Sequence, residues 1–226
     1  MNRASFMTDT IFFDLDGTLV DSVPGVQYAI QKAWQTIYPG IPCEDIRKLM
    51  GPPVREMFRR LAPRADELQL NQLENGFRLA YDSDGWQMTT PYPGVIPALQ
   101  ALQVANVRCL GVTNKPSRPT QRILSHCGFV GFFLAFLSID SRQPPFTSKA
   151  EAVRTLAAQH NINLTTAVLV GDTVEDARTA KDCGMKFVAF QGGYGWDNLL
   201  ASGDTAQTLV DFGELARLLH KTSLTG

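Results

Sequence analysis

Short apolar runs with the character of buried strands alternate with segments of helical spacing over most of the chain. The strand-like runs cover residues 11–14, 107–113, 132–137, 167–170 and 186–190. Helical spacing follows at 95–105, 119–127, 148–160 and 174–183. Repeated strand–helix units predict an α/β fold in which a doubly wound, Rossmann-like and mostly parallel sheet is covered on both faces. Ser148 precedes Glu151 by three residues, the spacing of a reciprocal capping box at a helix start.

One long segment interrupts this alternation. Between the first and second strands the chain has helical patterns at 26–37, 43–50, 54–61 and 65–81, separated by Pro- and Gly-containing turns. No apolar strand is evident there. We therefore predict an all-helical cap domain at 22–89, inserted into an α/β catalytic core formed by 1–21 and 90–226.

Composition excludes several classes of partner. The 226 residues carry a formal net charge of −1 with both signs spread along the chain, which predicts no nucleic-acid or membrane partner. The longest apolar stretch, 129–137, is too short to cross a bilayer, and no leader segment is evident. The four cysteines include no CxxC pair, so a reducing, cytoplasmic location is expected. A chain of this size is expected to be a monomer or a homodimer that acts on a small molecule.

Polar side chains follow several of the predicted strands. In a doubly wound sheet the functional site lies beyond the carboxyl ends of the strands. The residues that the sequence delivers there are Asp14, Asp16, Gly17 and Thr18 after the first strand, Thr113, Asn114 and Lys115 after the second, and Asp172, Glu175 and Asp176 after the fourth. Lys149 adds a cation at the start of the helix after the third. A single aspartate after a strand is most often a helix cap or turn residue, but the joint occurrence favours one shared site.

These segments carry a family resemblance. Asp14-Leu15-Asp16-Gly17-Thr18, Thr113-Asn114, Lys149 and 171–176 (GDTVED) resemble the four motifs of the haloacid dehalogenase superfamily, in its aspartate-nucleophile phosphohydrolase branch. The predicted insertion resembles that superfamily's small helical cap. The resemblance extends over nearly the whole chain, including the glycine-rich 192–195, and is greatest to the phosphoglycolate phosphatases. It implies hydrolysis of a small phosphorylated metabolite.

The resemblance also implies roles for the individual residues. Asp14 would form an aspartyl-phosphate intermediate, and Asp16 would protonate the leaving oxygen and then activate water. Mg²⁺ would be held by Asp14, the main-chain carbonyl of Asp16 and Asp172, with support from Asp176 and, more weakly, Glu175. A cation is required on physical grounds too, because a carboxylate that attacks a phosphate dianion among other carboxylates meets like-charge repulsion.

Phosphate binding is implied for a second group of residues: Gly17, Thr18, Thr113, Asn114 and Lys149. In many relatives the third-motif lysine is followed by proline, whereas Ala150 follows Lys149 here. We prefer Lys149 over Lys115 as the phosphate-stabilising lysine, since it lies in the first turn of a capped helix.

Three alternatives stay open. A dehalogenase proper typically lacks the second aspartate, so Asp16 argues against that activity. A β-phosphoglucomutase-like enzyme would use the same motifs and return the phosphoryl group to a sugar, and a regulatory protein could keep the fold and the metal without turnover. Arg47 and Arg55, which flank the turn at 51–53, could meet a carboxylate of the substrate. They could equally be ordinary solvated charges.

Overall fold

The computed structural model describes residues 8–204 and 207–215. The chain divides into two compact units. An α/β unit comprises Met1–Val20 and Pro91–Gly226, and a helical unit comprises Asp21–Thr90. The strands β2 (Val20–Asp21) and β3 (Thr90–Pro91), which pair as a small two-stranded sheet, lie where the chain passes from one unit to the other.

The α/β unit contains a six-stranded sheet in the order β5-β4-β1-β6-β7-β8, with β1 near its centre. Its strands are β1 (Thr10–Phe13), β4 (Arg108–Thr113), β5 (Ala135–Ser138), β6 (Val168–Gly171), β7 (Lys186–Phe190) and β8 (Thr208–Leu209). Every neighbouring pair in this sheet is parallel. The carboxyl ends of the strands therefore meet at one edge of the sheet, as the alternating sequence pattern predicts.

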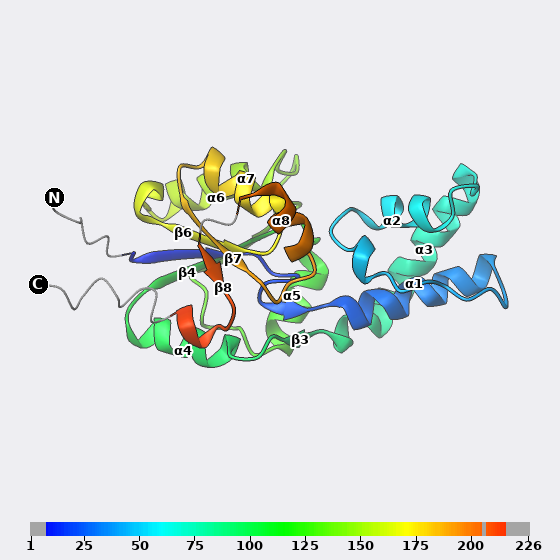
Figure 1. Ribbon diagram of the computed structural model, residues 1–226, viewed down its shortest axis with the longest axis horizontal. Coiled ribbons are helices and arrows are strands. Elements are labelled where there is room, and N and C mark those ends of the chain that lie inside the picture. Colours follow the sequence, from blue (N-terminus) through cyan, green and yellow to red (C-terminus); the bar gives the residue numbers. More distant parts are fainter. Residues whose placement is uncertain (1–7, 205–206, 216–226) are drawn as a thin grey trace, which may run out of the picture. The chain divides into compact units, whose positions relative to one another are not determined.

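Helices cover both faces of this sheet (Figure 1). On one face lie α4 (Val95–Val104) and α5 (Ser117–His126), and on the other lie α6 (Lys149–Gln159), α7 (Val174–Asp182) and α8 (Trp196–Ser202). A short 3₁₀ turn, η3 (Leu164–Thr166), leads into β6. The prediction of a doubly wound, mostly parallel sheet is confirmed.

The centre of the sheet is mainly apolar, with Thr10 as a buried polar residue of β1. All four residues of β1 are buried, and Phe12 packs with Leu110 of β4 and Leu169 of β6 under the apolar face of α6. Burying a large apolar side chain contributes roughly 1.5–3 kcal/mol. This packing fixes the position of β1, and with it the place where Asp14 leaves the strand.

The helical unit has its own core. It consists of α1 (Val23–Ile37), η1 (Arg47–Leu49), α2 (Val54–Leu61), α3 (Glu67–Ser83) and η2 (Gly85–Met88). Phe58 and Leu73 are fully buried between α1, α2 and α3. Asp66 begins α3 with a complete capping box, in which its carboxylate accepts from the Gln69 main chain while the Gln69 side chain accepts from the Asp66 main chain.

Two predicted elements differ from the structure. The helix predicted at 43–50 is reduced to the turn η1, because the Gln27 side chain accepts from the main chain of Ile46 at 2.9 Å and donates to that of Glu44 at 3.3 Å. The strand predicted at 132–137 begins only at Ala135, because the chain turns at Gly131 (φ 95°). The elements α8 and β8 were not predicted from the apolar pattern.

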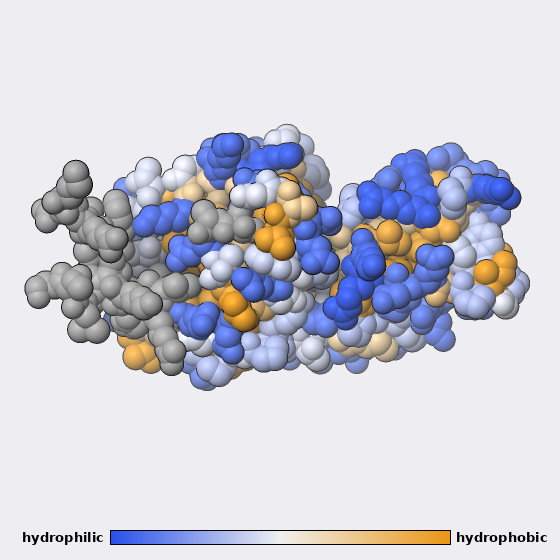
Figure 2. Space-filling view, in the orientation of Figure 1, coloured by the Kyte–Doolittle hydropathy of each residue, from blue (hydrophilic) through white to orange (hydrophobic). Residues whose placement is uncertain are grey.

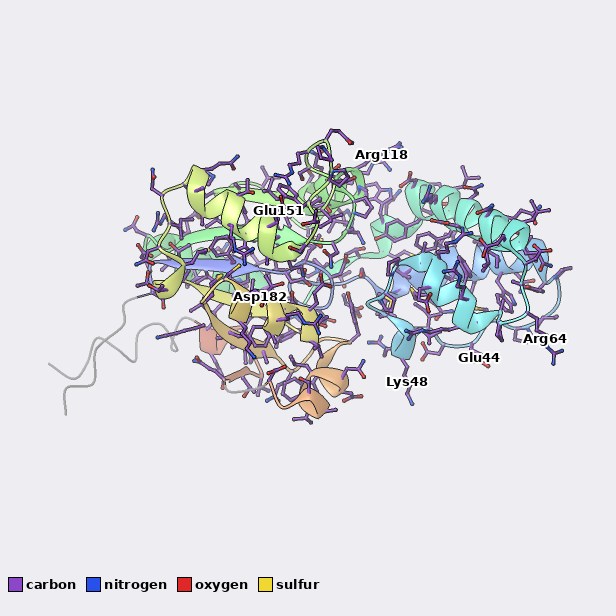
Figure 3. The ribbon with its side chains drawn as sticks, turned by 90° about the horizontal axis from the view of Figure 1, so that it is seen from above. Glu44, Lys48, Arg64, Arg118, Glu151 and Asp182 are labelled. Atoms are coloured by element: carbon purple, nitrogen blue, oxygen red, sulfur yellow. The ribbon has the colours of Figure 1, made fainter. Side chains whose placement is uncertain are left out.

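The visible surface of both units is mainly hydrophilic (Figure 2). Apolar residues appear there as separate patches between charged and polar ones. The exposed charged residues of the helical unit include Glu44, Lys48 and Arg64 (Figure 3). Among the helices of the described residues, none is both long and apolar enough to cross a membrane.

Candidate active site

The sharp turn after β1 positions the first pair of carboxylates. Asp14 donates its main-chain N–H to the carbonyl of Val170 in β6 at 3.0 Å, and the chain then folds back so that the carbonyl of Leu15 accepts from Leu19 at 2.9 Å. Gly17 adopts φ 84°, and a Cβ at this position would lie 2.4 Å from Asp172 Oδ2. Only glycine fits both the left-handed backbone and this close approach.

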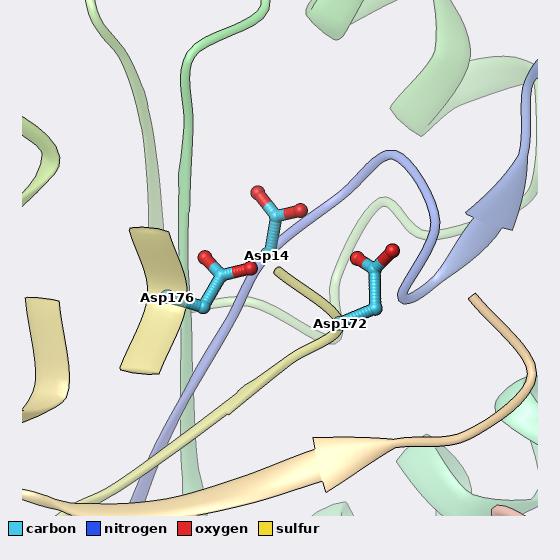
Figure 4. Close-up of side chains that lie close together, drawn as sticks. All are labelled: Asp14, Asp172 and Asp176. Atoms are coloured by element: carbon cyan, nitrogen blue, oxygen red, sulfur yellow. The ribbon is translucent and has the colours of Figure 1, made fainter. Parts of the chain in front are cut away.

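Three carboxylates from two segments of the chain gather beside this turn (Figure 4). Asp14, Asp172 and Asp176 are buried, and each offers an oxygen that lies within 4.8 Å of the others. Burial raises the pKa of Asp14 to about 7, and Lys149 opposes this rise. Burial, followed by the charges of Asp14 and Asp176, also raises the pKa of Asp172 well above its usual range. The cluster is therefore short of positive charge.

Lys149 lies inside this cluster. Its ammonium group donates to Asp14 Oδ1 and to Asp176 Oδ1, both at 2.7 Å, and only 4% of its side chain is exposed. Burial alone would lower the pKa of Lys149, but the two carboxylates outweigh it and raise the pKa above its ordinary value. The absence of proline after Lys149 does not keep it from the crevice.

The position of Lys149 is set by the start of α6. Ser148 accepts from the main chain of Glu151 at 3.2 Å, so one half of the predicted capping box is present. The predicted return bond is wrong, because the Glu151 carboxylate instead accepts from the main chain and the hydroxyl of Thr147, each at 2.8 Å, and pairs with Arg142. These contacts, the main-chain bond foremost, lower the pKa of Glu151 to about 2. Glu151 thus ties the loop before α6 to the helix that carries Lys149.

Lys115 also reaches the site, but at a different aspartate. Its ammonium group donates to both carboxylate oxygens of Asp16 at 3.1 Å, and only 9% of its side chain is exposed. The structure thus gives each lysine a separate position, with Lys149 among the three clustered carboxylates and Lys115 at Asp16. Lys115 is therefore not an ordinary solvated surface charge.

The end of β4 supplies the predicted hydroxyl and amide. Thr113 is buried, and its hydroxyl oxygen accepts from the main chain of Lys115 at 3.2 Å. Asn114 donates its side-chain amide to Glu175 Oε2 at 2.7 Å. Glu175 therefore holds Asn114. It is not one of the three residues whose carboxylate oxygens lie within 4.8 Å of one another.

Asp172 is fixed by hydrogen bonds from two sides. Thr18 donates its hydroxyl to Oδ1 at 3.0 Å, and Gly195 donates its main-chain N–H to Oδ2 at 2.9 Å. Asp176 is held by Thr173, whose main chain and hydroxyl donate to Oδ2 at 3.0 and 2.6 Å. Each carboxylate of the cluster consequently has a fixed orientation before any ligand arrives.

Tyr194 was not assigned a role from the sequence. Its hydroxyl donates to the main-chain carbonyl of Asp16 at 2.8 Å. Burial and the nearby carboxylates raise its pKa well above the usual value, so the hydroxyl keeps its proton. The position of Tyr194 near the site could have been predicted from topology. A loop that follows β7 lies at the same edge of the parallel sheet as Asp14 and Asp172.

The donor set fits a hard divalent cation. It consists of oxygen atoms held close together in a buried site, where negative charge exceeds the charge of Lys149. Carboxylate and carbonyl oxygens are the ligands that such cations prefer. Because burial raises the pKa of Asp14 and Asp172, a bound cation would favour their ionised forms.

The arginines of the helical unit lie apart from this cluster in sequence and have local partners. Arg55 donates to Asn71 at 2.8 Å and to Glu74 at 2.9 Å, and it also pairs with Glu67. This network favours a structural role for Arg55 within the helical unit. Arg47 lies 4.0 Å from Asp21, and 54% of its side chain is exposed.

Comparison with known proteins assigns the family. A family model described as haloacid dehalogenase-like hydrolase matches residues 11–190. The chain belongs to this family. It is 31% identical over 198 residues to a phosphoglycolate phosphatase of Rhodobacter capsulatus, covering 83% of this chain and 86% of the relative. It is 33% identical over 190 residues to a phosphoglycolate phosphatase of Cereibacter sphaeroides, covering 81% and 85%.

Solved structures share the fold of this haloacid dehalogenase-like hydrolase. A hydrolase of the same family from Streptococcus pneumoniae is 25% identical, with a TM-score of 0.81 and coverage of 92% of this chain and 97% of that one. CbbY from Rhodobacter sphaeroides, solved in complex with phosphate, is 17% identical with a TM-score of 0.73, covering 92% and 96%. The predicted superfamily and the resemblance to phosphoglycolate phosphatases are confirmed, and the enzyme is a phosphatase.

Removal of the buried lysine should destabilise the cation-free protein. We expect Lys149→Met to lower the free energy of unfolding by about 3 kcal/mol in the presence of a chelator, because two buried carboxylates lose the ammonium group that pairs with both of them. Urea unfolding measures this change. Lys48→Met, at an exposed lysine of the helical unit, is the control and should change stability by less than about 0.5 kcal/mol. Equal effects of the two substitutions would contradict this account of the cluster.

Proposed function

We propose that this phosphatase hydrolyses a small phosphate monoester with the aid of Mg²⁺, through a phosphoryl group carried by Asp14. The observation that carries the proposal is the burial of Asp14, Asp172 and Asp176 together with Lys149 at the carboxyl ends of β1 and β6. Such an arrangement suits a divalent cation, which would in turn favour a substrate that brings negative charge and oxygen ligands. The curated relatives support a substrate similar to phosphoglycolate.

In the first step a carboxylate oxygen of Asp14 attacks phosphorus, and the ester P–O bond breaks. The leaving alkoxide takes a proton from Asp16, which lies two residues further along the turn. The products of this step are a free alcohol and a phosphoryl group joined to Asp14. Because the attack occurs at phosphorus while the proton is delivered to the leaving ester oxygen, two aspartates are needed.

In the second step a water molecule attacks the phosphorus of the phosphoryl-aspartate. Asp16, now ionised, takes a proton from that water, and the P–O bond to Asp14 breaks. Inorganic phosphate leaves and the Asp14 carboxylate is restored. Lys115 contacts both oxygens of Asp16 at 3.1 Å, which supports a role in orienting that carboxylate before the substrate binds.

Mg²⁺ would be held by Asp14, Asp172 and the main-chain carbonyl of Asp16, with Asp176 in support. Bound there, it supplies Lewis-acid stabilisation of the charge that develops on the phosphoryl oxygens. Thr18 donates a hydrogen bond to Asp172. This contact favours a role for Thr18 in orienting the metal ligand Asp172 over the predicted direct contact with phosphate.

Phosphate binding would fall to the groups around the nucleophile. Lys149 already contacts Asp14 at 2.7 Å, so its charge lies next to the incoming phosphoryl group. Thr113 and the Asn114 amide lie at the end of the neighbouring strand, and Gly17 lets the main chain approach closely. We place these residues around the three non-bridging oxygens of the phosphoryl group.

Substrate selection would fall to the helical unit, because the residues around Asp14 recognise only the phosphoryl group. Arg55 is already bound to Glu67 and Glu74, so binding a substrate carboxylate would require it to leave those partners. Arg47 has one distant partner at 4.0 Å and is the better candidate for that contact.

The nucleophile and the metal are tested together. We expect the parent enzyme to release phosphate from phosphoglycolate and from 4-nitrophenyl phosphate only when Mg²⁺ is present. Asp14→Asn should lower both rates by at least about 10⁴-fold, because the amide cannot carry the phosphoryl group. A phosphate-release assay with Mg²⁺ or with a chelator measures both effects.

Asp211→Asn is a matched control, since Asp211 lies after β8 and its side chain accepts from the main chain of Gly213. This variant should retain the parent rate. Metal-independent turnover, or substantial activity in Asp14→Asn, would contradict the proposal. Transfer of phosphate to an added sugar phosphate in place of water would indicate a mutase.

The role of Asp16 depends on the leaving group. We expect Asp16→Asn to lower turnover of phosphoglycolate by at least about 100-fold, because an alkoxide needs a proton to leave. Nitrophenolate leaves without one, so the same variant should release nitrophenol in a burst of about one equivalent and then stall before hydrolysis of the phosphoryl group. Rapid-mixing absorbance measures the burst. Equal losses on both substrates with no burst would show that Asp16 is not the acid and base.

A further inference from the structure

The loop between β7 and α8 contacts both proposed ligand segments of the metal site. Tyr194 donates its hydroxyl to the main-chain carbonyl of Asp16 at 2.8 Å, and Gly195 donates its N–H to Asp172 Oδ2 at 2.9 Å. Neither contact is explained by phosphoryl transfer itself. One loop therefore bridges the end of β1 and the end of β6.

The fit of this loop is tight. A Cβ on Gly193 would lie 2.3 Å from the carbonyl oxygen of Gly17 and 2.3 Å from Cβ of Asp172, distances that no side chain can occupy. The main chain before Tyr194 is thus in contact with the same two segments. Tyr194 cannot shift far without moving the loop that holds Asp172.

The carbonyl that Tyr194 contacts belongs to the peptide that joins Asp16 to Gly17. The N–H of this peptide donates to the carbonyl of Val20 at 2.9 Å, and Gly17 adopts φ 84°, which glycine reaches without strain. A carbonyl oxygen has two acceptor positions. The Tyr194 hydroxyl occupies one of them, so the peptide is held on its carbonyl side as well as on its N–H side, and the other acceptor position stays available.

We propose that Tyr194 is a positioning residue for the metal site, and that its hydroxyl holds the Asp16 carbonyl in the direction required to bind Mg²⁺. The inference rests on the proposed function, in which that carbonyl is a ligand. Residues that orient metal ligands commonly affect affinity by about 10- to 100-fold when they are changed. Tyr194 touches neither the substrate nor the reacting atoms in this account.

The test is the affinity for Mg²⁺ itself, measured without substrate. We expect Tyr194→Phe to weaken Mg²⁺ binding by about tenfold in a calorimetric titration. The rise in melting temperature caused by a fixed Mg²⁺ concentration should shrink accordingly, since ligand stabilisation follows the ratio of concentration to Kd. Tyr28→Phe removes a tyrosine hydroxyl that donates to Asp84 at 3.3 Å in the helical unit, and it should leave Mg²⁺ affinity unchanged.

A purely structural role predicts a different result. Tyr194→Phe would then lower the melting temperature equally with and without Mg²⁺ and leave Kd unchanged, which would overturn the inference but not the proposed function. If the parent protein bound no Mg²⁺, both would be overturned. Should the phenylalanine variant fail to fold, Tyr194→Gln, which keeps a donor, is compared with Tyr194→Leu, which does not. Equal Mg²⁺ affinity in these two variants would also overturn the inference.

Discussion

The crowding of three buried carboxylates is the constraint on which the rest of the α/β unit depends. Asp14, Asp172 and Asp176 bring oxygens within 4.8 Å of one another at a place where water cannot screen their charges. Such a cluster is costly unless positive charge and hydrogen bonds compensate it. Lys149 supplies one positive charge. The remaining negative charge would draw a divalent cation to the site, and the bound cation would offset the repulsion of an anionic phosphoryl group.

The surrounding segments divide the work of maintaining this cluster. The apolar centre of the sheet fixes where β1 and β6 end, and the helix starts at Ser148 and Thr173 aim Lys149 and Asp176. The loop with Tyr194 closes the other side against Asp16. In the proposed function, the chemistry specific to phosphate would belong to the α/β unit, and the helical unit would select the rest of the substrate.

The sequence was most informative where local pattern and tertiary packing agree. Both α2 (Val54–Leu61) and β7 (Lys186–Phe190) occur at the predicted bounds, and the polar residues that follow the strands do meet at one edge of the sheet. Prediction failed where distant side chains intervene. Gln27 takes the hydrogen bonds that a helix at 43–50 would have made, and the contacts of Lys115 and Tyr194 with Asp16 depend on loop conformations that no periodicity encodes.

The central claim is that phosphate is carried by Asp14 during turnover. Its most direct test is acid quenching of a single turnover with ³²P-labelled substrate and Mg²⁺, followed by mapping of the labelled peptide. The account predicts transient covalent label on the peptide that contains Asp14, at up to about one equivalent, and none in Asp14→Asn. Phosphate release at the parent rate with no covalent label at any quench time would contradict it.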